Sequence, residues 1–336
     1  MSVLEQVALH MLPQTGVAFS FGYGSKVVKQ AGKQSASDLI DVIIAVEDPL
    51  KWHQENLNMN RQHYSFIRYL PNSAELITRL QEDVGARIYF NPYVRFSNVS
   101  LKYGIIKLEH MIEDLTTWNM LYVSGRLHKP VEVIIDTSDK MENLRSAIKF
   151  NRESAIRCAL LQLPEVFDSF TLYETIVGLS YHGDPRMIFG EDKHKIKNIV
   201  SSQIDRLDQI YLPILKTNSM FRDSIRWNET KQTFTQDLSS SAILRNLKLL
   251  PKEVRRTLCE VHSQEARTIE PEIILASASK SIICDKILAQ SIAIIVRRSS
   301  LSQSLKGVIT AGFLKSIRYS QRKLIKSFKS RLNWAC

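Results

Sequence analysis

The sequence predicts an α+β protein in which a mixed α/β domain precedes a mainly helical one. Residues 38–46 form a near-continuous apolar run rich in valine and isoleucine, which is typical of a strand buried on both faces. After Met141 the apolar residues follow a helical period almost throughout. The 336 residues suit two domains at roughly 100–200 residues each. We therefore predict domains over residues 1–145 and 146–296, followed by a basic segment over 297–336.

The first domain is predicted to alternate strands with helices. Residues 16–25 indicate a strand that runs into a glycine turn. Pro49 directly follows Glu47 and Asp48, and it can open a helix after the buried strand. Further on we expect helices over 73–83 and 108–122, a strand over 87–96 with a break at Pro92, and a strand over 131–135.

The positive charge of the chain is concentrated at its C-terminal end. The sequence has 45 basic and 34 acidic residues, for a net charge of +11. Asp285 is the last acidic residue and eleven basic residues follow it, so residues 1–285 are neutral overall. A segment of one charge sign favours an anionic surface, which is either phospholipid or nucleic acid.

The spacing of residues 313–332 favours the lipid. On a helix, the large apolar side chains would form one broad stripe and the basic side chains its flank. The stripe holds Phe313, Leu314, Ile317, Leu324, Ile325, Phe328 and Leu332, and the flank holds Lys315, Arg318, Arg322, Lys326 and Lys329. A core helix with a solvated basic side would show the same pattern. We expect a C-terminal amphipathic helix that associates peripherally with an anionic membrane surface.

The composition excludes several classes of protein. With 44% apolar and 24% charged residues, the chain is neither mostly disordered nor collagen-like. The longest apolar candidate for a membrane span, residues 282–296, is interrupted by Asp285 and Lys286. The N-terminal residues include Glu5 and no arginine, unlike a transit peptide. The cysteines lack disulfide or zinc-site spacing and indicate a reducing compartment; they are Cys158, Cys259, Cys284 and Cys336.

A glycine turn between two strands is the first motif that points to chemistry. Residues 22–25 (GYGS) end the first strand, and Asp38 and Asp41 begin the second. Glycine lets the backbone approach a triphosphate, and exposed N–H groups with the Ser25 hydroxyl can hold its oxygens. Carboxylates on the neighbouring strand can hold Mg²⁺. This layout resembles the nucleotidyltransferase fold of the DNA polymerase beta type, although a plain tight turn would use the same glycines.

The two aspartates depart from the usual spacing of that fold. Metal-binding carboxylates at i and i+2 share one face of a strand, whereas Asp38 and Asp41 are three residues apart and would point to opposite faces. Either a bulge realigns the pair, or Asp41 works with a carboxylate from elsewhere, such as Asp48 or Asp114. Asp41 is the first candidate for the metal and Asp38 the second.

Long stretches along nearly the whole chain carry a wider resemblance. They are FGYGSKVVKQAG (21–32), DVIIAVEDPLKWHQENLNMNRQHYS (41–65), GARIYFNPY (85–93), KYGII (102–106), IEDLTTWNMLYVSGRLHKPV (112–131), GLSYHGDPRMIFGEDKHKIKNIV (178–200) and SQSLKGVITAGFLKSIRY (302–319). In this order they resemble the mitochondrial phosphatidate cytidylyltransferase family, also called the mitochondrial translocator assembly and maintenance protein family.

The resemblance implies a transferase reaction with Mg²⁺ as cofactor, in which CTP and phosphatidic acid give CDP-diacylglycerol and pyrophosphate. It also implies a peripheral position on the matrix side of the mitochondrial inner membrane, where the product serves phosphatidylglycerol and cardiolipin synthesis. The lipid phosphate would attack the α-phosphate of CTP. Gly24 and Ser25 would hold the β- and γ-phosphates, and Asp41 would bind Mg²⁺.

Further residues of the matching stretches are candidates for contacts with the substrates. Lys26 beside the turn is either a phosphate contact or an exposed lysine. Arg126 and Lys129, beside a predicted strand, either clamp phosphate or form surface salt bridges. His53 either hydrogen-bonds the nucleotide or is a structural histidine.

A dense polar string in the helical domain, residues 184–195, either is a solvated face or closes over CTP or the lipid head. Arg186 and Lys195 are its candidates for anionic contacts. The alternative function is nucleotide transfer to RNA, which would use the basic tail on phosphates. The apolar stripe of that tail argues against it, and we expect no nucleic-acid partner.

Overall fold

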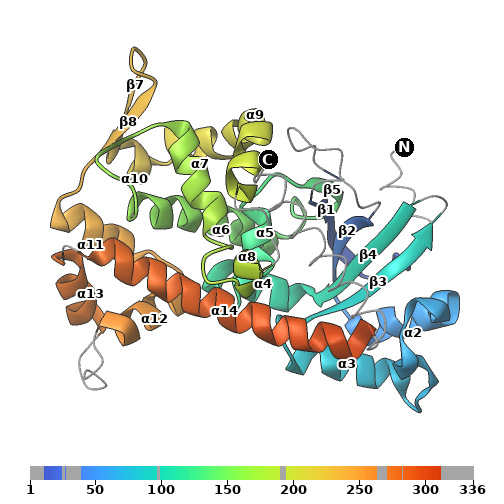
Figure 1. Cartoon of the computed structure of the whole chain (residues 1–336). Helices are drawn as coiled ribbons and strands as arrows, with labels where there is room; N and C mark the ends of the chain where they lie inside the picture. Colours follow the sequence, from blue (N-terminus) through green and yellow to red (C-terminus); the bar gives the residue numbers. More distant parts are fainter. Residues whose placement is uncertain are drawn as a thin grey trace, which may run out of the picture.

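A mixed sheet and a larger helical part make up the structure, which confirms the predicted α+β class (Figure 1). Several sequence predictions lie outside the residues that the structure describes: the tail helix, Ser25, Lys26 and Asp38. This computed structural model describes residues 11–24, 27, 39–96, 99–189, 194–262, 271–281 and 283–311.

The larger sheet has the strand order β3-β4-β2-β1-β5. Strand β1 (Val17–Tyr23) pairs antiparallel with β2 (Leu39–Val46) and with β5 (Glu132–Asp136). Strand β2 pairs in parallel with β4 (Val99–Lys107), and β3 (Ile88–Phe96) pairs antiparallel with β4. One parallel pair among antiparallel ones makes this a mixed sheet.

Helices cover both faces of this sheet. One face packs through Phe21 and Ile43 against α4 (Leu108–Thr117), α5 (Ser124–Leu127) and the first half of α6 (Glu142–Leu160). The opposite face, with the alternate residues of β2, packs against α2 (Pro49–Asn60) and α3 (Ser73–Asp83); η1 (Arg61–His63) and η2 (Phe66–Tyr69) connect these two helices. Strand alternation therefore gives β2 an apolar residue at nearly every position.

Two predicted elements of the first domain need correction. Strand β4, which lies between β3 and α4, was not predicted from the sequence. The helix predicted over 108–122 ends at Thr117, and Trp118 follows in the left-handed conformation with φ 56°. By contrast, β3 confirms a strand with an irregularity near Pro92, because its register shifts between Asn91 and Val94.

The second part of the chain is mainly helical, with one exception. Strands β6 (Val166–Phe167), β8 (Thr233–Gln236) and β7 (Ile225–Asn228) form a small sheet, so the prediction of helix almost throughout was too broad. A common core of apolar residues joins the helices. These helices are α7 (Ser169–Gly178), α9 (Lys195–Thr217), α10 (Ser219–Arg222), α11 (Ser240–Lys248), α12 (Lys252–His262), α13 (Pro271–Ser279) and α14 (Cys284–Ala311), and the short α8 (Pro185–Phe189) contacts α14.

Two helices run through the predicted domain boundaries. In α6, Leu144 and Ala147 belong to the core under the sheet, whereas Ala155 and Leu160 belong to the helical core. Helix α14 continues without interruption past residue 296 and runs along the molecule to α3 (Figure 1). Among the described residues, no helix combines the length and the apolar character that a membrane span requires.

Candidate active site

The glycine turn and Asp41 lie side by side at one end of the sheet. Gly24 follows β1 with φ +90°, a left-handed conformation that favours glycine, and its carbonyl accepts a hydrogen bond from the Val27 N–H at 3.2 Å. A Cβ atom built on Gly24 would lie 3.9 Å from Oδ2 of Asp41. The glycine turn therefore lies directly beside the Asp41 carboxylate.

Asp41 faces a lysine from the neighbouring strand. The register pairs Tyr23 with Asp41 and Asp41 with Lys102, so these three side chains lie in a row across β1, β2 and β4. The Lys102 Nζ atom is 3.5 Å from Oδ1 of Asp41 and 4.3 Å from the centre of the Phe90 ring. The side chain of Asp41 is 26% exposed, so the carboxylate remains accessible to a ligand.

The other two carboxylates considered for a metal have structural roles. Asp48 caps α2, where its Oδ1 accepts from the Lys51 N–H at 3.1 Å. Asp114 is buried and accepts backbone hydrogen bonds from the loop that follows α4. In the described ranges no group of three or more His, Cys, Asp or Glu side chains could hold a metal ion. Asp41 alone still fits Mg²⁺, which commonly uses one or two carboxylates together with substrate phosphates.

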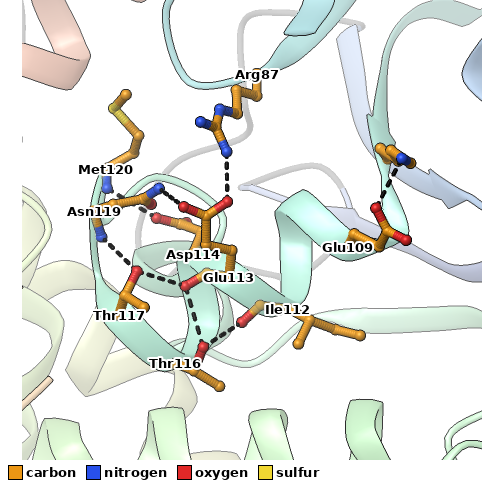
Figure 2. A network of polar contacts seen from close by, with 10 residues as sticks. Arg87, Glu109, Ile112, Glu113, Asp114, Thr116, Thr117, Asn119 and Met120 are labelled. Carbon is orange, nitrogen blue, oxygen red and sulfur yellow. Dashed lines mark hydrogen bonds and ion pairs between the residues drawn. The ribbon is translucent and has the colours of Figure 1, made fainter. Parts of the chain in front are cut away.

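Asp114 shapes the loop that leads to the first cationic residue. Its Oδ1 accepts from the Met120 N–H at 3.1 Å, and its Oδ2 accepts from the Val123 and Ser124 N–H groups at 2.8 and 3.0 Å. Figure 2 shows Asp114 beside Glu113. Glu113 connects the same loop to Arg87, whose Nη1 donates to Oε2 of Glu113 at 2.5 Å. Such bonds end α4 early and fix the start of α5, which carries Arg126.

Arg126 lies between two tyrosine rings. Its guanidinium carbon is 3.8 Å from the centre of the Tyr122 ring and 5.0 Å from that of Tyr23, and Nη1 donates to the Tyr122 carbonyl at 2.5 Å. Tyr23 is the cross-strand neighbour of Asp41. Within the described residues Arg126 forms no ion pair with a carboxylate. Arg126 is therefore held rigidly near Asp41 without being neutralised by an acid.

Lys129 and Lys195 share one tyrosine. The Lys129 Nζ atom donates to the Ser180 hydroxyl at 2.7 Å and lies 4.7 Å from the centre of the Tyr181 ring. The Lys195 Nζ atom, from the start of α9, lies 5.1 Å from the same ring. Residues from three separate parts of the sequence therefore meet around Tyr181.

Arg186 extends this group of cations. Its guanidinium forms two-point contacts with Asp184, at 3.0 Å from Nε and 2.6 Å from Nη2 to Oδ2. Burial opposes the charged form of Arg186, but the hydrogen bonds and charge of Asp184 outweigh burial and raise its pKa, while the charge of Arg126 lowers it. Helices α5 and α8, which carry the two arginines, lie near the centre of the view in Figure 1, next to α6.

The charges of this group act on one another. Burial lowers the pKa of Lys129 well below its usual value, and the positive charges of Arg126 and Lys195 lower it further. Burial raises the pKa of Tyr23, and Asp41 raises it further, while Arg126 opposes this shift. Arg126 and Lys129 form no ion pair with an acid among the described residues, and close cations of this kind are typical of a site for an anion.

His53 does not join this group. It belongs to α2, on the opposite face of the sheet, and is fully buried. Its two ring nitrogens bond to the Tyr64 hydroxyl at 2.8 Å and to Oε1 of Gln81 at 2.9 Å. Burial lowers the pKa of His53 to about 4, against the weaker opposing effect of Gln81. The sequence left open whether His53 contacts the nucleotide or is a structural histidine. Its placement favours the structural role.

Three residues that contact the candidate site residues were not predicted from the sequence. Lys102 escaped because β4 was not predicted; recognising a strand in the KYGII stretch would have placed it beside Asp41. Tyr122 and Ser180 escaped because tyrosine and serine are common in loops, and only the fold brings them to Arg126 and Lys129.

Comparison with known proteins identifies the family. The family model described as "Phosphatidate cytidylyltransferase, mitochondrial" matches residues 5–326. Proteins of that name from Danio rerio and Drosophila melanogaster are 37% and 38% identical to this chain; the alignments cover 98% and 94% of it and 95% and 96% of the relatives. The Caenorhabditis elegans protein is 35% identical over 96% of this chain and 98% of its own length. The chain therefore belongs to the mitochondrial phosphatidate cytidylyltransferase family.

Proposed function

We propose that this protein transfers the cytidylyl group of CTP to phosphatidic acid and releases pyrophosphate. One observation carries the proposal: Asp41 and the glycine turn lie beside a group of cations that includes Arg126 and Lys129, which have no acidic partner in the described part of the chain. A triphosphate and a lipid phosphate are anions that such a group would hold. The names of the relatives support the same two substrates.

The proposed reaction is a direct displacement at the α-phosphorus of CTP. A phosphate oxygen of phosphatidic acid attacks the α-phosphorus of CTP, the bond from that phosphorus to the bridging oxygen breaks, and pyrophosphate leaves in line. Arg126 and Lys129 would stabilise the negative charge on the transferring and departing groups. Gly24, with Ser25 and Lys26 beside it, would hold the β- and γ-phosphates.

A magnesium ion is the proposed cofactor. Asp41 would hold it, with Asp38 as a second candidate, and the bound ion would neutralise charge on the α-phosphate and pyrophosphate. The partly exposed carboxylate of Asp41, next to the glycine turn that would hold the phosphates, supports this role. Removal of divalent cations by a chelator should therefore abolish turnover, and added Mg²⁺ should restore it.

The first test is direct. Purified protein is mixed with CTP, Mg²⁺ and phosphatidylcholine vesicles that contain phosphatidic acid, and both pyrophosphate and CDP-diacylglycerol are measured. We expect both products in equal amounts. Absence of pyrophosphate would contradict the proposal, and incorporation of labelled nucleotide into added RNA would favour the alternative function.

We also propose a mitochondrial, membrane-bound setting, on the matrix face of the inner membrane, where the product serves phosphatidylglycerol and cardiolipin synthesis. The basic and apolar residues after Ala311 support a peripheral contact with anionic lipid. A chain that ends at Ala311 should bind anionic vesicles more weakly than the full chain while binding CTP equally well. Neutral phosphatidylcholine vesicles are the control, and equal binding of both chains to anionic vesicles would contradict the tail's role.

A further inference from the structure

The turn before α8 connects the proposed site to α14 through one buried carboxylate. Asp184 is 4% exposed. Its Oδ1 accepts from Nε of Arg186 at 3.0 Å and from the Ser300 hydroxyl at 2.9 Å, and its Oδ2 accepts from Nη2 of Arg186 at 2.6 Å. Arg186 and Ser300 are far apart in the sequence, so the carboxylate joins two separate elements.

The backbone of this turn is pressed against α14. Gly183 has φ +77°, and a Cβ atom built on it would lie 2.4 Å from the Ala293 carbonyl oxygen and 2.8 Å from its Cα atom. Only glycine can adopt this conformation and allow this approach. The turn and α14 are therefore in direct backbone contact as well as joined by Ser300.

Helix α14 is in turn fixed to the sheet that carries Asp41. One turn after Ser300, Gln303 accepts from the Ala86 N–H at 3.1 Å and donates to the Ile88 carbonyl at 3.3 Å. Lys306 donates to the carbonyls of Gln81 and Val84 at 3.1 and 2.7 Å. Ser300 thus has a defined position relative to the sheet, and its hydrogen bond to Asp184 fixes the position of that carboxylate as well.

The remaining face of Arg186 is available. Its side chain is 48% exposed. Nε and Nη2 are occupied by Asp184, whereas Nη1 makes no hydrogen bond with any residue that the structure describes. One side of the guanidinium is held by the protein and the other can donate to an anion.

We propose that Asp184 and Ser300 are positioning residues, which aim the guanidinium of Arg186 at an anionic group of the substrate. This inference rests on the proposed function, because the anion is a phosphate of CTP or of phosphatidic acid. Removing the Ser300 hydroxyl leaves a buried lone pair of Asp184 without a donor and lets the carboxylate rotate, so Arg186 loses its fixed direction. If the anion is a phosphate of CTP, loss of Arg186 changes the KM for CTP. If it is the phosphate of phosphatidic acid, the KM for phosphatidic acid changes instead.

The test is a double-mutant cycle on the full-length protein. Ser300→Ala, Arg186→Ala and the double variant are compared for kcat/KM with CTP and with phosphatidic acid, and for CTP binding by calorimetry. Ser299→Ala is the matched control, because Ser299 is also buried and its hydroxyl donates to the Val296 carbonyl in its own helix. If Arg186→Ala has no measurable turnover, Arg186→Lys replaces it in the cycle, since lysine cannot reproduce the two-point contact with Asp184.

We expect Ser300→Ala to lower kcat/KM about tenfold, and to have no further effect once Arg186 is replaced. Ser299→Ala should behave as the wild type, and all variants should melt within a few degrees of one another. Activity of Ser300→Ala equal to that of Ser299→Ala, or an equal loss in both backgrounds, would overturn the inference. An inactive wild type would instead contradict the proposed function. In that case the same double-mutant cycle, applied to the CTP affinities measured by calorimetry, tests the role of Ser300.

Discussion

The two faces of the five-stranded sheet differ in how their polar side chains are partnered. On the face of α2 and α3, a cluster of uncharged polar side chains is buried, and its members bond to one another; they are His53, Asn56, Tyr64 and Tyr103. Asn56 donates to the hydroxyls of Tyr64 and Tyr103 at 2.9 and 2.8 Å, and Tyr64 also bonds to His53. The face of α4 and α5 carries the ionisable side chains Asp41 and Arg126, and Arg126 forms no ion pair with an acid among the described residues.

The partners of a polar side chain therefore distinguish a structural residue from a candidate for substrate binding, whatever its residue type. A buried polar group that is fully hydrogen-bonded stabilises one packing arrangement and has no donor left for a ligand. Charges whose nearest partners are tyrosine rings and serine hydroxyls retain the capacity to bind an anion. His53 and Arg126 were both sequence candidates for substrate contacts, and their partners place them in opposite groups.

The largest expected effect comes from the charged face. Asp41→Asn should lower kcat by about a thousandfold or more, because the amide cannot replace the negative charge that a metal ion requires. Stability should change little, since the carboxylate is partly exposed. Activity assays and thermal melting measure the two quantities. Asp48→Asn serves as the control, and turnover by Asp41→Asn at the control's level would remove Asp41 from the metal site.

The opposite face should respond in stability alone. His53→Leu removes both bonds of a fully buried ring and leaves the Tyr64 hydroxyl and Gln81 with unpaired groups. We expect a loss of about 2–4 kcal/mol in the free energy of unfolding, measured with urea. Under conditions where the variant is folded, kcat should equal that of the wild type. A specific loss of kcat in folded protein would return His53 to the site.

Acid should destabilise the protein through the same face. The native pKa of His53 is about 4 and that of an unfolded histidine about 6.5, so between these values the unfolded chain binds the proton and the native state does not. Stability is therefore complete above pH 6.5 and falls as the pH drops toward 4, by on the order of 3 kcal/mol from this residue. His128 lies outside this face, at the end of α5, and its pKa, lowered to about 3 by burial and by Lys129, adds to the trend.

The control for this pH dependence is the His53→Leu variant. Its unfolding free energy should depend less steeply on pH between 6.5 and 4 than that of the wild type. Parallel pH profiles for the two proteins would show that His53 is charged in the native state, against the neutral network described above.

The smallest effect should come from exchanging one cation for another. Arg126→Lys keeps the charge but loses the flat guanidinium that lies between Tyr23 and Tyr122. We expect about a tenfold decrease in kcat/KM for CTP, or about 1.4 kcal/mol. Arg256→Lys, in a surface ion pair of α12, should leave kcat/KM unchanged. Equal values for both variants would remove Arg126 from the site.

Local patterns were sufficient to predict the strand, turn and strand that contain Gly24 and Asp41. These residues are close in the chain, and the alternation of β1 and the apolar run of β2 are strong signals. Strand β4 gave a weak signal because its first residues, such as Ser100 and Lys102, are polar, and its parallel pairing with β2 spans a long separation. The early end of α4 depends on Asp114, whose hydrogen bonds no periodicity reveals.

The sequence by itself determined the charge distribution, the α+β class, and a carboxylate next to a glycine turn, because each depends on composition or on neighbours in the chain. Only the tertiary structure decided that Lys129, Lys195 and Arg186 gather near Arg126, and that Lys102 pairs with Asp41. These cations come from segments separated by tens of residues. Their repulsion is overcome by the packing of the helices that carry them, and helix packing depends on the whole core rather than on any local pattern.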